Sequence, residues 1–201
     1  MGKVFFFLFT FCIQANSYAQ PTTIPGKPRQ LTKKEIEKDK RDKNCFYKKK
    51  YSITERLQFF PFNKAAKIKL VSFDKPDSVI MGGELPMKNE EVDYSRLKEI
   101  KTIGKSQIDT LTDILFNEGY GGSFYSFSES MCYNPRNAIL FIDANGKTFG
   151  FIEICFECSG YRLSSKKIKA GYFCNQKYDY LRNFFAANGI VFGVKKEPTA
   201  E

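Results

Sequence analysis

Residues 137–158 read NAILFIDANGKTFGFIEICFEC, and this stretch decides the fold. Two apolar runs flank the segment Asp143-Ala144-Asn145-Gly146, which has Asp at the first position of a type I turn and Gly where a left-handed backbone is needed. If the loop is 144–146, Asp143 pairs with Lys147, and the numbers of every further pair add to 290. The sequence therefore predicts an antiparallel hairpin over residues 137–158.

The 290 register sorts the side chains of this hairpin onto two faces. The first face carries no charge and consists of Ala138, Leu140, Ile142, Gly150, Ile152, Ile154, Phe156 and Cys158. The second face combines apolar residues with Glu153, Cys155 and Glu157. We expect the first face to lie in the core and the second to be partly exposed to water.

Further strands are predicted on both sides of the hairpin. Residues 67–73 alternate between polar and apolar, residues 78–81 form a short apolar run, and residues 190–194 are apolar again. Residues 88–101 are charged and irregular, so we expect a loop with a helical turn there.

Three helices are predicted between these segments. Ser52 and Glu55 have the spacing of a capping box ahead of a short helix, which Pro61 ends. Residues 106–119 and 175–189 each combine an N-cap residue, an apolar face and a closing glycine.

The order of these elements predicts the fold class. Strands and helices do not alternate regularly, which favours an α+β fold with an antiparallel sheet, including the 137–158 hairpin, and helices packed on one face. We expect residues 51–196 to form a single α+β domain, followed by a tail at 197–201.

Residues 1–19 have the pattern of a secretory signal peptide. Lys3 precedes an unbroken apolar run, Val4–Ile13, and Ser17-Tyr18-Ala19 supplies small residues for cleavage. The run is too short to cross a bilayer core of about 30 Å, so no transmembrane segment is expected. The bulky Phe11 before Cys12 argues against a lipoprotein. The prediction is a protein that is secreted or periplasmic after cleavage.

Residues 20–50 are predicted to form a proline-containing tether and a basic, solvated helix. The stretch 27–50 holds eleven Lys or Arg and four Asp or Glu, while the rest of the mature chain is close to neutral. A polar connector is the favoured interpretation, and weak contact with an anionic surface is the alternative. Because the excess charge is local, specific binding of nucleic acid is not expected.

The composition excludes several kinds of chemistry. The chain contains no His, which removes Ser-His and Cys-His nucleophile pairs and His-ligated zinc. Carboxylate, Tyr, Lys and thiol chemistry remain. No cofactor is predicted.

Cysteine pairing depends on the hairpin register. The 290 register places Cys132 opposite Cys158 on one face, which predicts a disulfide between them. Residues three apart in a strand have Cα atoms about 10 Å apart, so a Cys155–Cys158 bond is not expected. Cys155 would then be free or bonded to Cys174. A zinc site made of Cys132, Cys155, Cys158 and Cys174 is a weaker alternative.

The leading functional interpretation is an exported, non-catalytic binding or structural domain whose partner is an unknown protein or envelope component. The alternative is a thiol-disulfide redox protein that uses Cys155 and Cys158. A third is a hydrolase that uses Glu153 and Glu157, whose Cα atoms would be about 7 Å apart on alternate strand positions.

Two motifs carry a family resemblance. The runs Cys132-Tyr133-Asn134-Pro135-Arg136 and Ile152-Glu153-Ile154-Cys155-Phe156-Glu157-Cys158, with the helix around Phe184-Phe185, resemble a group of uncharacterised exported bacterial proteins. The resemblance covers about 132–190 and brings no known activity. It implies that this part of the chain is a unit.

Overall fold

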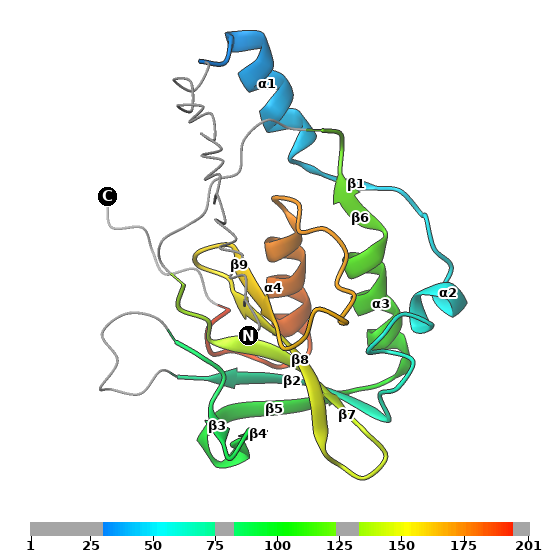
Figure 1. Ribbon diagram of the computed structural model, residues 1–201, viewed down its shortest axis with the longest axis vertical. Coiled ribbons are helices and arrows are strands. Elements are labelled where there is room, and N and C mark those ends of the chain that lie inside the picture. Colours follow the sequence, from blue (N-terminus) through cyan, green and yellow to red (C-terminus); the bar gives the residue numbers. More distant parts are fainter. Residues whose placement is uncertain (1–29, 75–82, 124–132, 195–201) are drawn as a thin grey trace, which may run out of the picture. The chain divides into compact units, whose positions relative to one another are not determined.

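The computed structural model describes residues 30–74, 83–123 and 133–194 of the chain (Figure 1). The predicted signal peptide, the predicted strand at 78–81, the tail at 197–201 and Cys132 lie outside the described residues. The helices are α1 (Lys33–Asp42), α2 (Ile53–Leu57), the 3-10 helix η1 (Tyr94–Arg96), α3 (Lys105–Phe116) and α4 (Lys177–Ala187). The strands are β1 (Cys45–Tyr47), β2 (Lys67–Phe73), β3 (Met87–Lys88), β4 (Glu91–Val92), β5 (Leu97–Ile103), β6 (Glu118–Tyr120), β7 (Asn137–Ile142), β8 (Thr148–Cys155) and β9 (Gly160–Leu163).

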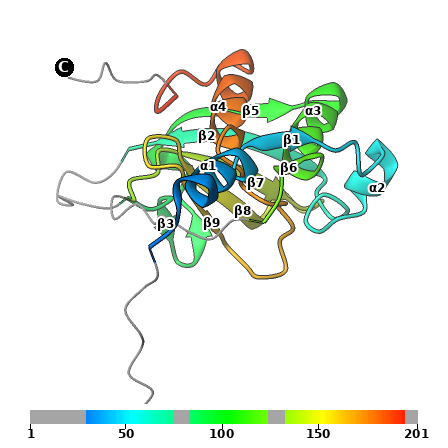
Figure 2. The same ribbon diagram turned by 90° about the horizontal axis from the view of Figure 1, so that it is seen from above.

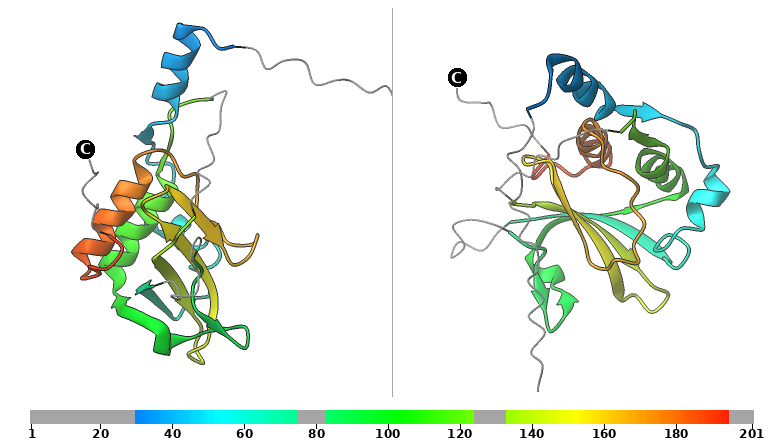
Figure 3. Two further views of the ribbon diagram at one scale, coloured as in Figure 1. Left: turned by 90° about the vertical axis from the view of Figure 1, so that its left-hand side faces the viewer. Right: turned by 45° about the horizontal axis from the view of Figure 1, so that its top comes forward.

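The predicted α+β class is confirmed. Five antiparallel strands form one sheet in the order β5-β2-β7-β8-β9. The helices α3 and α4 lie side by side (Figures 1 and 2), and both cover the same face of the sheet (Figure 3). Leu111 and Leu115 of α3 and Leu181 of α4 are fully buried in one cluster with Ile139 and Ile152 of the sheet.

A second apolar cluster fills the opposite face of the sheet. Val71, Phe73 and Leu140 pack there against Leu85 and Val92 from the segment that carries the small β3-β4 hairpin. Every residue of β7 is buried, so the central strands are covered on both sides.

The turn of the predicted hairpin is confirmed. The Asp143 N–H donates to the Lys147 carbonyl at 2.9 Å, and the Gly146 N–H donates to the Asp143 carbonyl at 3.1 Å. Gly146 has φ of 85°, the left-handed conformation that the turn requires.

The predicted register of the strands is wrong beyond the turn because β8 contains a bulge. Ile142 pairs with Thr148, but Phe141 pairs with Gly150, so Phe149 is an extra residue. Each later pair is shifted by one, which places Ile139 and Phe141 on the same face as Ile152. The expected division into a core face and a wet face therefore fails. The sequence pattern did not reveal the shift, because β7 carries uncharged residues on both faces and so does not favour one register over the other.

Local signals placed several elements correctly. The strand β2 has the predicted bounds, and α2 begins with the predicted capping box, in which Ser52 N–H donates to Glu55 Oε2 at 2.7 Å. The other two helices begin near the predicted residues. Gly104 rather than Ser106 is the N-cap of α3, and Gln176 rather than Asn175 is the N-cap of α4.

Two predicted segments differ from the structure. Residues 88–101 contain β4, η1 and most of the edge strand β5, whose charged side chains hid the strand pattern. Residues 190–194 do not form a strand. Instead, the N–H groups of Val191 and Phe192 donate to the carboxylate of Glu99 at about 3.0 Å.

Residues 33–50 belong to the body of the protein. The predicted helix is present as α1, but β1 pairs with β6, and the described residues from Lys33 onward fall in one compact unit. The expected boundary at residue 51 is therefore corrected to about Lys33. None of the described helices is long and apolar enough to cross a membrane.

Candidate ligand-binding pocket

A disulfide between Cys45 and Cys174 joins β1 to the segment that leads into α4. Their Cα atoms are 5.1 Å apart. Hydrogen bonds surround the link: the Cys45 N–H donates to Gln176 Oε1 at 2.7 Å, and the Asn175 N–H donates to the Lys43 carbonyl at 3.0 Å. Of the two alternatives for Cys155, free or bonded to Cys174, this link excludes the second.

Residues close in sequence to the two ends of this link, Lys48 and Tyr172, line a pocket of about 750 Å³. The pocket lies between the segment after β1, the end of α3 with β6, and the loop before α4. Its described lining consists of Lys48, Lys50, Tyr51, Phe59, Phe116, Asn117, Glu118, Gly119, Tyr120, Gly122, Ser123, Leu163, Ile168, Lys169, Ala170, Gly171 and Tyr172. We call it the lysine-tyrosine pocket. Its size and mixed lining are typical of sites for small molecules.

Aromatic rings form much of the wall. The rings of Phe59 and Phe116 are 4.8 Å apart, and the ring of Tyr51 meets Phe59 edge-on at 5.0 Å. The rings of Tyr120 and Tyr172, which also line the pocket, are 6.2 Å apart. Tyr172 is 75% exposed, which is unusual for so large a ring and leaves its face available to a ligand.

Two basic stretches that are distant in the sequence meet at this pocket. Lys48 and Lys50 follow β1, whereas Lys169 belongs to the loop 164–172. Within the described ranges, no ion pair holds the ammonium groups of Lys48 and Lys169. Lys50 lies 5.1 Å from the centre of the Tyr51 ring, and a hydrogen bond to the Tyr51 side chain raises the pKa of Lys50.

Glu118 is the one acidic residue among the described lining residues. Partial burial raises the pKa of its carboxyl, repulsion from Asp113 adds to this, and attraction to Lys177 opposes it. No hydrogen bond from the part of the chain that the structure describes reaches this carboxylate. A half-buried carboxylate without a donor needs one from water or from a ligand.

Lys177 lies behind the pocket wall and is fully buried. Its Nζ donates to the Leu115 carbonyl at 2.7 Å. Burial lowers the pKa of Lys177 to about 7, and attraction to Glu118 opposes that shift.

Gly171 allows the wall to pack closely at this point. It has φ of 65°, and a Cβ atom there would lie 2.0 Å from the Leu115 carbonyl oxygen. Only glycine therefore fits, and the loop beside Tyr172 is held against the end of α3.

The predicted Cys132–Cys158 disulfide is wrong, because Cys158 is bonded to Cys155. The strand β8 ends at Cys155, and residues 156–159 turn the chain into β9, with Ser159 in the left-handed region. This turn brings the two Cα atoms to 5.6 Å, whereas a continued strand would have kept them apart. Cys155 is buried and Cys158 is partly exposed.

The alternative zinc site is not assembled. Cys155 and Cys158 are bonded to each other, and Cys174 is bonded to Cys45. Among the described residues, no group of three or more Cys, Asp or Glu is placed to hold a metal ion.

The pair Glu153 and Glu157, the candidates of the third, hydrolase interpretation, is not assembled either. Glu153 is fully buried and accepts two hydrogen bonds from Arg162, at 3.0 and 3.1 Å, and one from the Tyr133 hydroxyl at 2.9 Å. The Leu85 N–H donates to it as well. Glu157 lies in the exposed turn beyond the end of β8, with Arg136 3.7 Å away. These four hydrogen bonds satisfy the Glu153 carboxylate within the fold, which assigns it a structural role rather than a catalytic one.

A second cavity of about 660 Å³ shares Lys50, Tyr51 and Asn117 with the lysine-tyrosine pocket. Its main charge is Arg56, which is buried and pairs with Asp109 and Asp113. Because Arg56 is already paired with these two aspartates, this cavity has fewer charged groups available to bind a ligand than the lysine-tyrosine pocket has.

Sequence patterns gave no signal for the pocket, because its walls come from the segment after β1, the end of α3, β6 and the loop before α4. No family model, curated protein or solved structure matches the chain. The resemblance of residues 132–190 to exported bacterial proteins stays a prediction.

Proposed function

We propose that the protein is an exported, non-catalytic binding domain whose ligand site is the lysine-tyrosine pocket. The observation that carries this proposal is Glu118, a half-buried carboxylate without a hydrogen-bond donor among the described residues, in a pocket that also offers ammonium and phenol groups. Concave sites with a few convergent polar groups on an apolar wall are typical ligand sites.

Two features support export. Residues 1–19 have the pattern of a signal peptide, and the described chain contains two disulfides. Disulfides form and persist mainly in oxidising compartments, such as the periplasm or the extracellular space. The proposed location is therefore periplasmic or extracellular.

The chemistry of the lining favours binding over catalysis. Nucleophile activation in enzymes usually needs a base next to the nucleophile. The chain has no His, and the described lining offers one carboxylate with lysines and tyrosines rather than a matched acid and base pair.

A fragment screen by NMR tests this proposal. Hits should perturb the amides of residues 118–120 and 169–172. Tyr172→Ala should weaken the binding of these hits, because it removes an exposed ring of the pocket. Tyr180→Ala is the matched control, since Tyr180 is an exposed ring on α4 that does not line the pocket. Hits that cluster elsewhere, or the lack of any hit, would contradict the proposal.

The observed Cys155–Cys158 bond favours a second candidate, thiol-disulfide exchange. The pair forms a C-x-x-C disulfide, and Cys158 is partly exposed. Its position in a hairpin turn lacks the helix N-terminus that stabilises a thiolate in many redox enzymes. An insulin-reduction assay tests it: a rate above that of dithiothreitol alone, lost in Cys155→Ser/Cys158→Ser, would favour this candidate. We expect no such rate.

A further inference from the structure

We propose that the lysine-tyrosine pocket binds an acidic saccharide, a sugar ring that carries a carboxylate and several hydroxyl groups. This inference rests on the proposed binding function and names the chemical class of the ligand.

Charge gives the first step. Lys48, Lys50 and Lys169 contribute three ammonium groups to the lining, against the single carboxylate of Glu118. Ammonium groups bind carboxylates through charge-assisted hydrogen bonds, which are stronger than neutral ones. A ligand of this pocket therefore carries an anionic group.

Glu118 gives the second step, because a purely anionic ligand would be repelled by it. Its partial burial favours a partner that donates a hydrogen bond. A cationic donor, such as the ammonium group of a free amino acid, would be repelled by the three lysines. Neutral hydroxyl groups can donate a hydrogen bond to Glu118 without bringing a positive charge close to the three lysines. Together with the anionic group that the lysines require, this makes the ligand a hydroxylated acid.

The aromatic walls give the third step. Tyr120 and Tyr172 form a pair of rings on one side, and the Tyr172 ring is largely exposed. The C–H face of a pyranose ring is apolar and flat enough to pack on such rings, while its hydroxyls remain at the edge. An open-chain hydroxy acid would leave these rings exposed to water.

The main chain argues against an acidic peptide as the ligand. Extended peptides are usually bound through hydrogen bonds to a free strand edge. The N–H groups of Lys48 and Lys169 already donate to the carbonyls of Asn117 and Phe60, both at 2.8 Å. The pocket therefore offers side-chain groups rather than an open strand edge.

Isothermal titration calorimetry with three probes tests this inference: digalacturonate, its uncharged counterpart galactobiose, and the dipeptide Glu-Glu. We expect digalacturonate to bind at least about tenfold more tightly than either of the other probes. Its affinity should fall as salt rises from about 20 to about 200 mM, because the lysines are exposed and are screened by salt.

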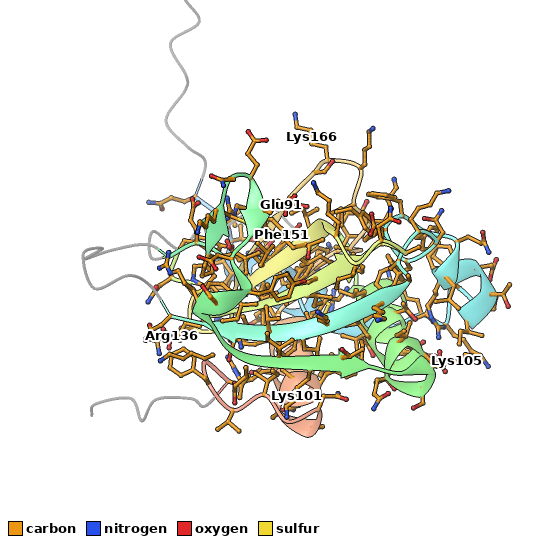
Figure 4. The ribbon with its side chains drawn as sticks, turned by 90° about the horizontal axis from the view of Figure 1, so that it is seen from below. Glu91, Lys101, Lys105, Arg136, Phe151 and Lys166 are labelled. Carbon is orange, nitrogen blue, oxygen red and sulfur yellow. A yellow bond between two sulfur atoms is a disulfide. The ribbon has the colours of Figure 1, made fainter. Side chains whose placement is uncertain are left out.

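Variants locate the binding site. Lys169→Gln and Lys48→Gln should each weaken digalacturonate binding about fivefold. Tyr172→Ala and Glu118→Gln should also weaken it. Lys105→Gln is the charge-matched control, because Lys105 is an exposed lysine at the start of α3 that does not line the pocket (Figure 4). It should leave the affinity within about twofold of wild type.

Three results would overturn the inference. The first is tighter binding of Glu-Glu or galactobiose than of digalacturonate, and the second is an equal loss in Lys105→Gln and Lys169→Gln. The third is no binding of digalacturonate while the fragment screen finds other ligands in the pocket, in which case the proposed binding function stands. If neither experiment detects a ligand in the pocket, the proposed function fails as well.

Discussion

The two disulfides of the described chain differ in almost every respect. Cys45–Cys174 joins residues 129 apart in the sequence, whereas Cys155–Cys158 joins residues only 3 apart. Closing a long loop removes far more conformational freedom from the unfolded chain than closing a short one. The first bond should therefore act on the stability of the whole fold, and the second only on a turn.

The structure around each disulfide also differs. The long-range bond supports a ribbon of only three residue pairs, between β1 and β6, beside the lysine-tyrosine pocket. The short-range bond closes the β8-β9 hairpin, which has four residue pairs and is also held by the cross-strand contact of Glu153 with Arg162. The comparison teaches that a disulfide matters most for stability where the residues it joins are far apart in the sequence and the strand pairing beside it is short.

The largest effect is expected when the long-range bond is removed. Cys45→Ser/Cys174→Ser should lower the free energy of unfolding by up to about 5 kcal/mol, through the freedom that the unfolded chain regains. Urea denaturation followed by circular dichroism measures this change. A loss below about 1 kcal/mol would show that the β1-β6 ribbon does not depend on the bond.

Arg162→Met is expected to cost about 3 kcal/mol, because it leaves the buried carboxylate of Glu153 without its cation. The same denaturation experiment measures it. In the control, Arg162→Met/Glu153→Met, both charges are replaced, so part of the loss should be recovered. If the double variant is no more stable than Arg162→Met, the ion pair is not the cause.

Removal of the short-range bond should have a smaller effect than Arg162→Met. Cys155→Ser/Cys158→Ser should lower the free energy of unfolding by less than about 2 kcal/mol, because the closed loop is very short. A loss larger than that of Cys45→Ser/Cys174→Ser would reverse the comparison between the two bonds.

A pH-dependent effect concerns Lys177, whose N–H donates to the Cys174 carbonyl beside the long-range bond. Its pKa is about 7 in the folded protein against 10.5 as the reference, so the unfolded chain binds more protons between these values. The free energy of unfolding should therefore rise with pH above 7, by at most about 1.4 kcal/mol per pH unit.

Denaturation of wild type and Lys177→Met at pH 6 to 9 measures this contribution. The difference between the two proteins should change in favour of wild type as the pH rises, because the variant lacks the buried amine. A difference that does not depend on pH would contradict the lowered pKa of Lys177.

Local signals in the sequence predicted much of the fold. The 143–146 turn, the Ser52 capping box and the alternation at 67–73 each depend on neighbouring residues, and all three are confirmed. The bulge at Phe149 was not predicted, because the turn fixes only the first pairs, and β7 carries uncharged, buried residues on both faces and so does not favour one register over the other.

The cysteine pairing and the pocket were not predictable either, because both depend on where the chain turns and which distant segments meet. The early end of β8 at Cys155 changes which sulfurs can meet, and the interrupting residues 156–159 carry no strong turn signal before Ser159. The pocket depends on Lys48 and Lys169 coming together, and nothing local to either stretch indicates this.

A tryptic map of the protein under non-reducing conditions tests the assignment of the two bonds most directly. It should contain the peptide 44–48, with Cys45, linked to the peptide 170–177, with Cys174. It should also contain the peptide 148–162 lighter by two hydrogens than its reduced form, because Cys155 and Cys158 are bonded within it. A linked pair that joins Cys132 to Cys158, or an alkylated Cys45, would contradict the account.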